Sequence, residues 1–128
     1  MAGQRAVRTE GAPAPAGAYS QGVAGGNLMF VSGQSGRVPG GDLPETVADQ
    51  THQCLRNIAA ILEAGGFGLA DVVKSTVHLA SIDAFEEFNV AYAEHFSEPL
   101  PVRTTVQSGL RGRMLVEIDV VALRAETQ

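Results

Sequence analysis

The sequence predicts a single α+β domain in which two amphipathic helices cover one face of a mixed β-sheet. Short β-rich runs alternate with two longer segments of helical periodicity, in the order β-β-α-β-α-β-β. The chain of 128 residues has the size of one ordinary domain, and 45% of its residues are hydrophobic. A chain of this length and composition can form one substantial core.

The chain begins with a segment that has no regular pattern. Residues 1–16 are rich in Ala, Gly and Pro and are predicted to form a flexible lead-in. We expect one folded domain over residues 17–124, followed by residues 125–128, which should fray.

A β-hairpin is predicted at the start of the domain. Two β-rich runs, Tyr19 to Val23 and Leu28 to Ser32, flank Ala24-Gly25-Gly26-Asn27, whose glycines and asparagine tolerate positive φ. Because Leu28 to Val31 are all apolar, the second strand should lie in the middle of a covered sheet. It is expected to end at Ser32-Gly33-Gln34 and to lead into a loop rich in Gly and Pro.

The first helix follows this loop. Pro44 suits a first helical turn, and Gly65-Gly66 supplies a left-handed stop. Between them, one helical face is predicted by residues that recur at three- and four-residue steps: Val47, Thr51, Cys54, Leu55, Ile58 and Leu62. Since Cys54 lies on this stripe, we interpret it as a small buried hydrophobe rather than a nucleophile.

A strand and a second helix come next. Alternation from Asp71 to Leu79 predicts a strand with His78 on its more polar face. The helix should start at Asp83, which can form a capping box with Glu86 three residues on. Its aromatic residues are predicted to belong to the core rather than to a cofactor site: Phe85, Phe88, Tyr92 and Phe96.

The last two β-rich runs, Pro101 to Gln107 and Met114 to Val121, carry the residues of greatest chemical interest. Strand alternation places Glu117 on one face with Leu115 and Asp119, opposite to Met114, Val116, Ile118 and Val120. Arg103 follows a Pro-x pair that favours extended backbone. An arginine at the start of one strand and a glutamate inside the next form the candidate site.

A guanidinium can bind a carboxylate through two parallel hydrogen bonds, and a glutamate can position water or move a proton. The residues alone leave open that Arg103 and Glu117 form an ion pair between neighbouring strands. Ser32-Gly33 can present a hydroxyl and an open backbone N–H to a ligand, or form a plain turn. Asn89 is either a ligand contact or a solvated residue.

Composition excludes several functions. The net charge of −5 and pI near 5.0 argue against a nucleic acid or an anionic membrane as partner. The single cysteine fits a reducing compartment, and the chain lacks an apolar run of about 20 residues or a secretory segment, so we expect a cytoplasmic protein. His52, His78 and His95 lack metal-binding spacing, and no nucleotide-binding motif is present, so neither a metal nor another cofactor is predicted.

Both faces of several predicted strands carry apolar residues, whereas two helices can cover only one face of the sheet. The other face should therefore close against copies of itself, which predicts a homo-oligomer.

Short motifs in order along residues 12 to 123 give the chain its family resemblance. It resembles the Rid family, the YjgF-like reactive-intermediate imine deaminases, at Ala18-Tyr19-Ser20-Gln21, Gly26-Asn27, Phe30-Val31-Ser32-Gly33-Gln34, Gln50-Thr51, Asn57-Ile58, Ile61-Leu62-Glu63-Ala64-Gly65-Gly66, Asp71-Val72-Val73-Lys74, Phe88-Asn89, Tyr92, Pro101-Val102-Arg103-Thr104-Thr105-Val106 and Val116-Glu117-Ile118.

The resemblance implies a chorismate-mutase-like α+β fold, assembled as a homotrimer with the sheets facing inward and with three clefts between subunits. It implies a hydrolase without a cofactor that converts 2-imino acids or their enamine tautomers to 2-keto acids and ammonia. In this family pattern Arg103 binds the substrate carboxylate and Glu117 positions water. The remaining residues that the resemblance places in the cleft are Tyr19, Ser32, Gly33, Asn89 and Thr105.

The chain departs from the family pattern in two loops and at one strand position. Ser108 to Arg113 lacks the usual Leu-Pro pair and is one residue short, the loop after Gln34 begins Ser-Gly, and Thr105 stands where cysteine is common. Arg111 or Arg113 could therefore add a second anionic contact. Two alternatives remain: a non-catalytic metabolite-binding or interaction protein on the same trimer, and an endoribonuclease or translation inhibitor, which the acidic charge opposes.

Overall fold

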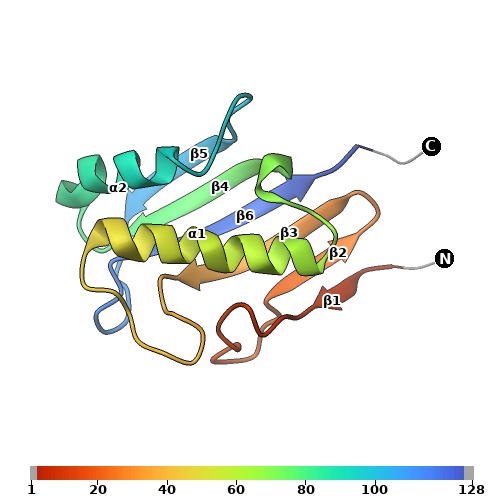
Figure 1. The fold of residues 1–128 in the computed structure, drawn as a ribbon, viewed down its shortest axis with the longest axis horizontal. Coiled ribbons are helices and arrows are strands. Elements are labelled where there is room, and N and C mark those ends of the chain that lie inside the picture. Colours follow the sequence, from red (N-terminus) through yellow and green to blue (C-terminus); the bar gives the residue numbers. More distant parts are fainter. Residues whose placement is uncertain (1–2, 126–128) are drawn as a thin grey trace.

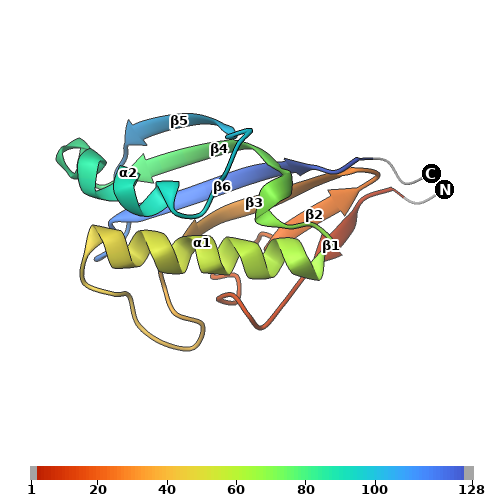
Figure 2. The same ribbon diagram turned by 45° about the horizontal axis from the view of Figure 1, so that its top comes forward.

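The protein is described by a computed structural model for residues 3–125, and two helices lie on one face of its sheet (Figure 1). Figure 2 shows the helices and the sheet as two layers. The strands are β1 Arg5–Val7, β2 Gly22–Gly25, β3 Leu28–Ser35, β4 Val72–Leu79, β5 Val102–Gln107 and β6 Val116–Leu123. The helices are α1 Val47–Ala64 and α2 Phe85–Ala93. A short 3-10 turn, Leu69–Asp71, follows α1, and another, Ile82–Ala84, precedes α2.

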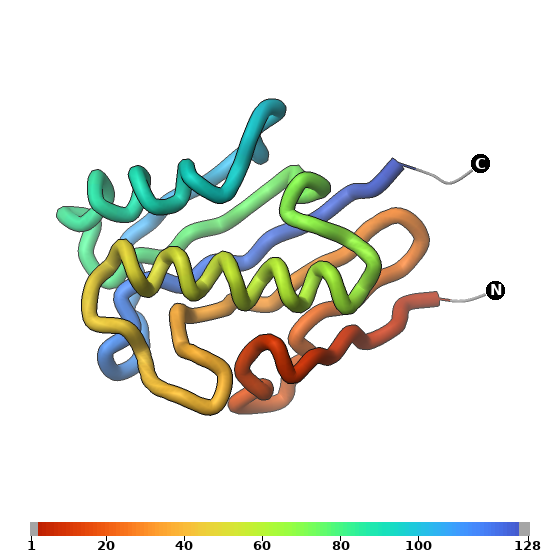
Figure 3. Tube along the Cα trace, in the orientation of Figure 1, coloured from red at the N-terminus to blue at the C-terminus, as the bar shows by residue number. Residues whose placement is uncertain are grey.

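The six strands form one mixed sheet in the order β1-β2-β3-β6-β4-β5. Every neighbouring pair is antiparallel except β4 and β5, which are parallel and are joined through α2. The predicted α+β domain with two helices on one face is therefore confirmed. The start of β1 and the end of β6 lie at the same end of the molecule (Figure 3).

The flexible lead-in predicted over residues 1–16 is wrong for much of its described part. Arg5–Val7 pair with Gly22–Ala24 as the edge strand β1. The buried Gln21 side chain then holds the following turn, because its amide donates to the carbonyls of Thr9 and Pro13 at 3.0 and 2.9 Å. A strand of three residues is too short to show a periodicity, so its order comes from tertiary partners. Residues 126–128 of the predicted frayed end lie outside the described part.

The hairpin and the first helix are found, but with different bounds: the first strand of the hairpin is Gly22–Gly25 rather than Tyr19 to Val23, which leaves only Gly26-Asn27 in the turn. Gly26 has φ +58°, as its turn requires. Helix α1 begins at Val47 rather than at Pro44, because the Thr46 hydroxyl accepts a hydrogen bond of 3.0 Å from the Asp49 N–H. The helix ends at Gly65-Gly66, as expected, and Gly66 adopts φ +87°.

Cys54 lies on the buried face of α1, which confirms its interpretation as a core residue. Its side chain is fully buried, and its thiol donates to the Gln34 carbonyl at 3.0 Å. Burial raises the pKa of this thiol, because the thiolate would lose its hydration. Cys54 is therefore an inert thiol that packs α1 against β3.

The aromatic stripe of α2 is core, but the predicted cap is wrong. The Ser81 hydroxyl accepts from the Asp83 N–H at 3.2 Å and starts the short turn that leads into α2, whereas Asp83 caps nothing. Phe88 and Tyr92 are buried, with ring centroids 5.3 Å apart. Within residues 3–125, no helix has the length and apolar character needed to cross a membrane.

Two histidines that are far apart in the sequence join the helices. His52 Nδ1 on α1 and His95 Nε2, just after α2, lie 2.8 Å apart in a hydrogen bond. Burial lowers the pKa of His95, and the charges of His52 and Arg56 lower it further, while Glu94 opposes the shift. Among the described residues no third ligand completes a metal site with this pair, so we interpret it as a contact between helices.

This pair predicts an acid-sensitive contribution to stability. The unfolded chain binds a proton at His95 more tightly than the folded chain, so the free energy of unfolding falls as the pH drops below about 6.5, the ordinary pKa of histidine. The loss ends once the pH is below the lowered folded-state pKa. His95→Gln should reduce this loss, and His52→Gln should reduce it in part. Urea unfolding between pH 8 and 4.5 measures it, and identical pH profiles for all three proteins would contradict the prediction.

Candidate active site

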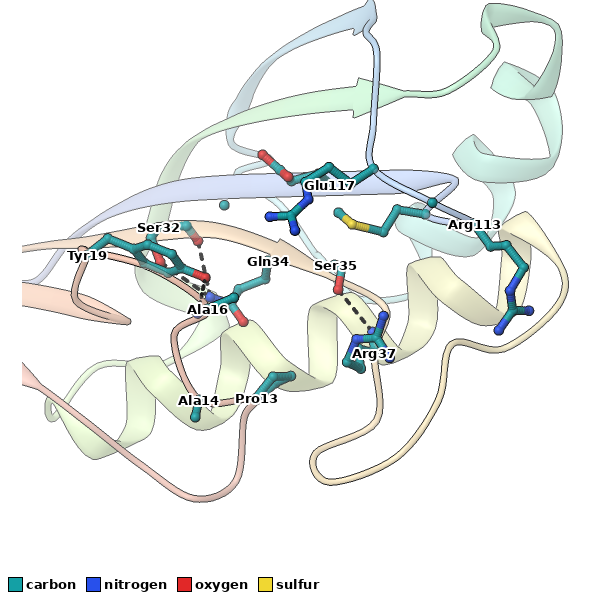
Figure 4. Close-up of a pocket in the computed structure, with 14 residues that line it drawn as sticks. Pro13, Ala14, Ala16, Tyr19, Ser32, Gln34, Ser35, Arg37, Arg113 and Glu117 are labelled. Atoms are coloured by element: carbon teal, nitrogen blue, oxygen red, sulfur yellow. Dashed lines mark hydrogen bonds between the residues drawn. The ribbon is translucent and has the colours of Figure 1, made fainter.

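A pocket of about 640 Å³ opens beside the end of β3, between the N-terminal segment and the loop that precedes β6. Four of the predicted site residues line it: Tyr19, Ser32, Gly33 and Glu117. Figure 4 shows Tyr19 and Ser32 on one side of the pocket, Arg113 on the other and Glu117 above them. The pocket thus gathers an aromatic hydroxyl, an aliphatic hydroxyl and a carboxylate.

Ser32 and Gly33 form an irregularity within β3 rather than its end. The register between β3 and β6 shifts between Val31 and Gln34, and the strand continues to Ser35. At this bulge the Ser32 N–H and hydroxyl both donate to the Gln21 carbonyl, at 2.9 and 3.1 Å. A bulge turns residues out of the regular ladder. The expected end of the strand at Ser32-Gly33 is therefore wrong, and the Ser32 hydroxyl donates to Gln21, but both residues line the pocket.

Gly33 makes room for the carboxylate of Glu117. A Cβ atom added at Gly33 would lie 2.5 Å from Oε2 of Glu117. Glu117 is half-buried and lies on the sheet face away from the helices, since its neighbours Val116 and Ile118 are fully buried on the other face. The Tyr19 hydroxyl accepts a hydrogen bond of 3.1 Å from the Ala16 N–H, which holds its ring at the pocket wall.

Two buried amide side chains on α1 hold the loops that form the pocket. Asn57 donates to the carbonyls of Ser35 and Arg37 at 3.1 and 2.8 Å. Gln50 donates to the carbonyls of Pro44 and Arg113 at 2.8 and 3.1 Å. The Gln50 side-chain oxygen also accepts from the Leu115 N–H at 2.8 Å. The loops on both sides of the pocket are therefore fixed to one helix.

Arg103, Asn89 and Thr105 lie elsewhere. Arg103 Nη1 donates to the Asn89 side-chain oxygen at 2.9 Å. The Arg103 guanidinium lies 4.8 Å from the ring centroid of Tyr92 and 5.5 Å from those of Phe85 and Phe88. Asn89 is therefore not simply a solvated residue, because its side chain makes a defined contact with Arg103.

The structure separates the predicted residues into two groups on opposite sheet faces. Arg103 and Thr105 pair with the buried Ser75 and Val77 and share their helix-facing side. Glu117 lies on the other side, and β4 separates β5 from β6. An ion pair between Arg103 and Glu117 as neighbours within one chain is therefore ruled out.

Sequence reasoning missed three residues that shape the pocket: Gln50, Asn57 and Arg37. The first two are fully buried, and both occur on the stripe of α1, seven residues apart. A polar residue at a position where the helical period predicts burial needs a hydrogen-bond partner, and this signal could have identified both. Arg37 had no such signal, because the direction of a loop depends on what anchors it.

The fold and pocket define a small α+β protein with a carboxylate and hydroxyl groups in a concave site. A family model described as Endoribonuclease L-PSP matches residues 9–124. The chain belongs to this family, the YjgF/RutC/Rid family, which confirms the resemblance seen in its motifs.

Relatives with known names match over almost the whole chain. Reactive Intermediate Deaminase A, chloroplastic, of Arabidopsis thaliana is 42% identical and covers 91% of this chain and 64% of its own length. The 2-iminobutanoate/2-iminopropanoate deaminase of Escherichia coli K12 is 38% identical, over 94% of this chain and 98% of its own.

Solved structures share the fold. RidA from Psychrobacter sp. PAMC 21119 superposes with a TM-score of 0.90 at 38% identity, covering 94% of this chain and 99% of its own. A putative endoribonuclease from Thermotoga maritima also has a TM-score of 0.90, at 43% identity, covering 94% and 98%.

The glycines of β3 and its loop give a stability prediction. Gly36→Ala should destabilise by about 3 kcal/mol or more, because its Cβ would clash with the rigid backbone oxygen of Gln50. Gly33→Ala should cost less, about 1 kcal/mol, because the three clashing atoms all belong to the flexible Glu117 side chain, which can change rotamer. Urea denaturation measures both, with Gly109→Ala as a control in open space. Equal losses at Gly33 and Gly36 would contradict this geometry.

Proposed function

We propose that the chain is an imine and enamine deaminase, a hydrolase acting on C–N bonds that converts 2-imino acids to 2-keto acids and ammonia. The observation that carries the proposal is the half-buried Glu117 carboxylate held against Gly33 in a pocket that also contains Ser32 and Tyr19. Relatives at 38–42% identity that are named as deaminases of this kind support it.

The reaction adds water across C=N and then expels ammonia, so it needs no redox step. Water attacks the imine carbon, and one of its protons moves to nitrogen. The resulting amino alcohol then passes its hydroxyl proton to nitrogen as the C–N bond breaks, which leaves a carbonyl and ammonia. Glu117 is the group in the pocket that can accept the water proton and return it to nitrogen. The Ser32 hydroxyl can orient the substrate. Since an imine already hydrolyses in water, positioning supplies most of the required rate enhancement.

The proposal assigns the substrate carboxylate to Arg103. The Asn89 contact uses one of its five N–H donors, and the surrounding rings hold the guanidinium plane, so donors remain for a bidentate carboxylate contact. Thr105, two residues along the same strand face, completes this part of the site.

Because Arg103 and Glu117 lie on opposite faces of one sheet, a complete site needs two copies of the chain. We therefore assign the protein to a homotrimer with inward-facing sheets, the chorismate-mutase-like arrangement, in which each cleft combines Glu117 of one copy with Arg103 of the next. The outer sheet face supports this assembly. Phe30 and Val102 are 53% and 66% exposed there, in one row of strand partners with Val121 and Lys74.

A non-catalytic metabolite-binding protein is the second candidate, and the same assay separates the two. The endoribonuclease name belongs to the family model and to some solved relatives. For this chain, the net charge of −5 works against a polyanionic substrate. Release of 2-keto acid and ammonia from freshly generated imino acids at rates above the spontaneous reaction supports the deaminase, and rates equal to the spontaneous reaction would favour the binder.

Glu117→Gln tests the proton-transfer role. The amide keeps the shape and hydrogen bonding of the side chain but cannot accept a proton, so kcat should fall about 100-fold or more. The dissociation constant of a 2-keto acid should change by less than about threefold. Ammonia release and calorimetric titration give these two numbers, and an unchanged kcat would make Glu117 a structural residue.

Gly33→Ala provides an independent test of the same carboxylate. It should leave the protein folded but push Glu117 out of position, and a misplacement of about 1 Å can cost about 100-fold in rate. The loss should appear in kcat, with Gly109→Ala as the control that retains activity. Full activity of Gly33→Ala would show that the position of the Glu117 carboxylate does not limit the reaction.

Arg103→Lys tests the carboxylate clamp. The charge is retained, but an ammonium group cannot reproduce two parallel hydrogen bonds, so affinity for a 2-keto acid should fall about tenfold or more, and further in Arg103→Ala. Arg124→Lys is a matched control, because Arg124 also lies over an aromatic ring, Phe67, at 4.3 Å. Similar dissociation constants in all four proteins would remove the clamp from the proposal.

A further inference from the structure

Three arginines line the pocket that contains Glu117. Arg37 comes from the loop after β3, and Arg111 and Arg113 come from the loop before β6. With Glu117 as the one carboxylate among the lining residues, three positive charges and one negative charge leave the pocket at +2, whereas the whole chain carries −5. A concave surface concentrates such a field on whatever enters it.

Hydrogen bonds hold the backbone of the two loops that carry these arginines. The Arg37 carbonyl accepts from the buried Asn57 side chain at 2.8 Å, and the Arg113 carbonyl accepts from the buried Gln50 side chain at 3.1 Å. The Met114 N–H donates to the Arg111 carbonyl at 3.1 Å, which closes a tight turn. Because the backbone is held in place, the three side chains start from fixed positions around the pocket.

The guanidinium groups retain most of their donors. All three arginine side chains are exposed, and Arg37 Nη1 makes a long 3.4 Å contact with the Gly41 carbonyl in its own loop. A guanidinium has five N–H donors, so most of those on Arg37 stay open to an anion. A neutral ligand would leave this charge without a partner.

We propose that this arginine cluster, Arg37 with Arg111 and Arg113, binds a second anionic group on the substrate, so that the preferred substrates are imines of dicarboxylic amino acids. The inference rests on the proposed deaminase function and specifies its substrate class. The α-carboxylate is assigned to Arg103, and the imine carbon to Glu117. The substrate side chain then extends over the arginine cluster in a pocket of about 640 Å³, larger than a small aliphatic imino acid requires.

The side-chain group is a carboxylate because the substrates derive from amino acids. Among the common amino acids, aspartate and glutamate carry an anionic side chain. Arginine binds a carboxylate through paired hydrogen bonds that a methyl group cannot accept. Discrimination between an acidic and an aliphatic side chain of equal length is therefore the property that the cluster should confer.

Binding of two five-carbon keto acids tests the inference without relying on turnover. The two compounds differ only at the last carbon, which is a carboxylate in 2-oxoglutarate and a methyl group in 2-oxopentanoate. Titration calorimetry at about 150 mM salt, which screens long-range attraction, should give at least tenfold tighter binding of 2-oxoglutarate. Arg111→Ala and Arg113→Ala should each weaken the binding of 2-oxoglutarate about tenfold and change the binding of 2-oxopentanoate less than twofold. Arg8→Ala, which removes the same charge outside this pocket, should change neither.

The outcomes separate this inference from the function on which it rests. Ammonia release is measured in parallel with imines generated from glutamate and from norvaline. Preference for 2-oxoglutarate without hydrolysis of either imine would support the arginine cluster and overturn the deaminase function. Hydrolysis of both imines at equal efficiency, with equal binding of the two keto acids, would overturn the substrate class. If Arg111→Ala and Arg113→Ala weakened the binding of both keto acids equally, the substrate class would also be overturned, because the cluster would then hold the α-carboxylate.

Discussion

The requirement that buried amides be hydrogen-bonded organises the pocket of this protein. Gln50 and Asn57 lie on the core-facing side of α1, where an unsatisfied amide would cost about 1–3 kcal/mol, and both find their partners on the loops that border the pocket. Within the described residues, every buried polar side-chain atom has a partner. The helix thus stabilises the fold through its apolar positions and fixes Arg37 and Arg113 through its two polar ones.

The alternation of β-strands sets the second constraint. Glu117 and Arg103 belong to strands separated by β4 and lie on opposite faces of one sheet, so one chain carries two incomplete halves of the proposed site. The exposed outer face of that sheet, with Phe30 and Val102 on it, is the surface through which copies could combine the halves. In this arrangement activity depends on assembly, because an isolated chain would lack a complete site.

Prediction from sequence succeeded where a local pattern reports burial directly. The apolar stripe of α1, the aromatic stripe of α2, the buried Cys54 and the outward direction of Glu117 all follow from a period of 3.6 or 2 residues. It failed where order comes from distant partners. The strand β1 depends on its pairing with β2, and the helix starts depend on which nearby hydroxyl, Thr46 or Ser81, reaches an unpaired N–H.

Residue types and spacing thus determined the class of fold, the core positions of the helices and the chemistry that Arg103 and Glu117 could perform. Only the tertiary structure decided which groups meet: His52 with His95, Arg103 with Asn89 above three rings, and Glu117 with Gly33 and the arginines of two separate loops. The physical reason is the distance along the sequence over which each signal acts. Periodicity records whether a side chain faces core or solvent, whereas the identity of its neighbour depends on strand order and loop anchoring across dozens of residues.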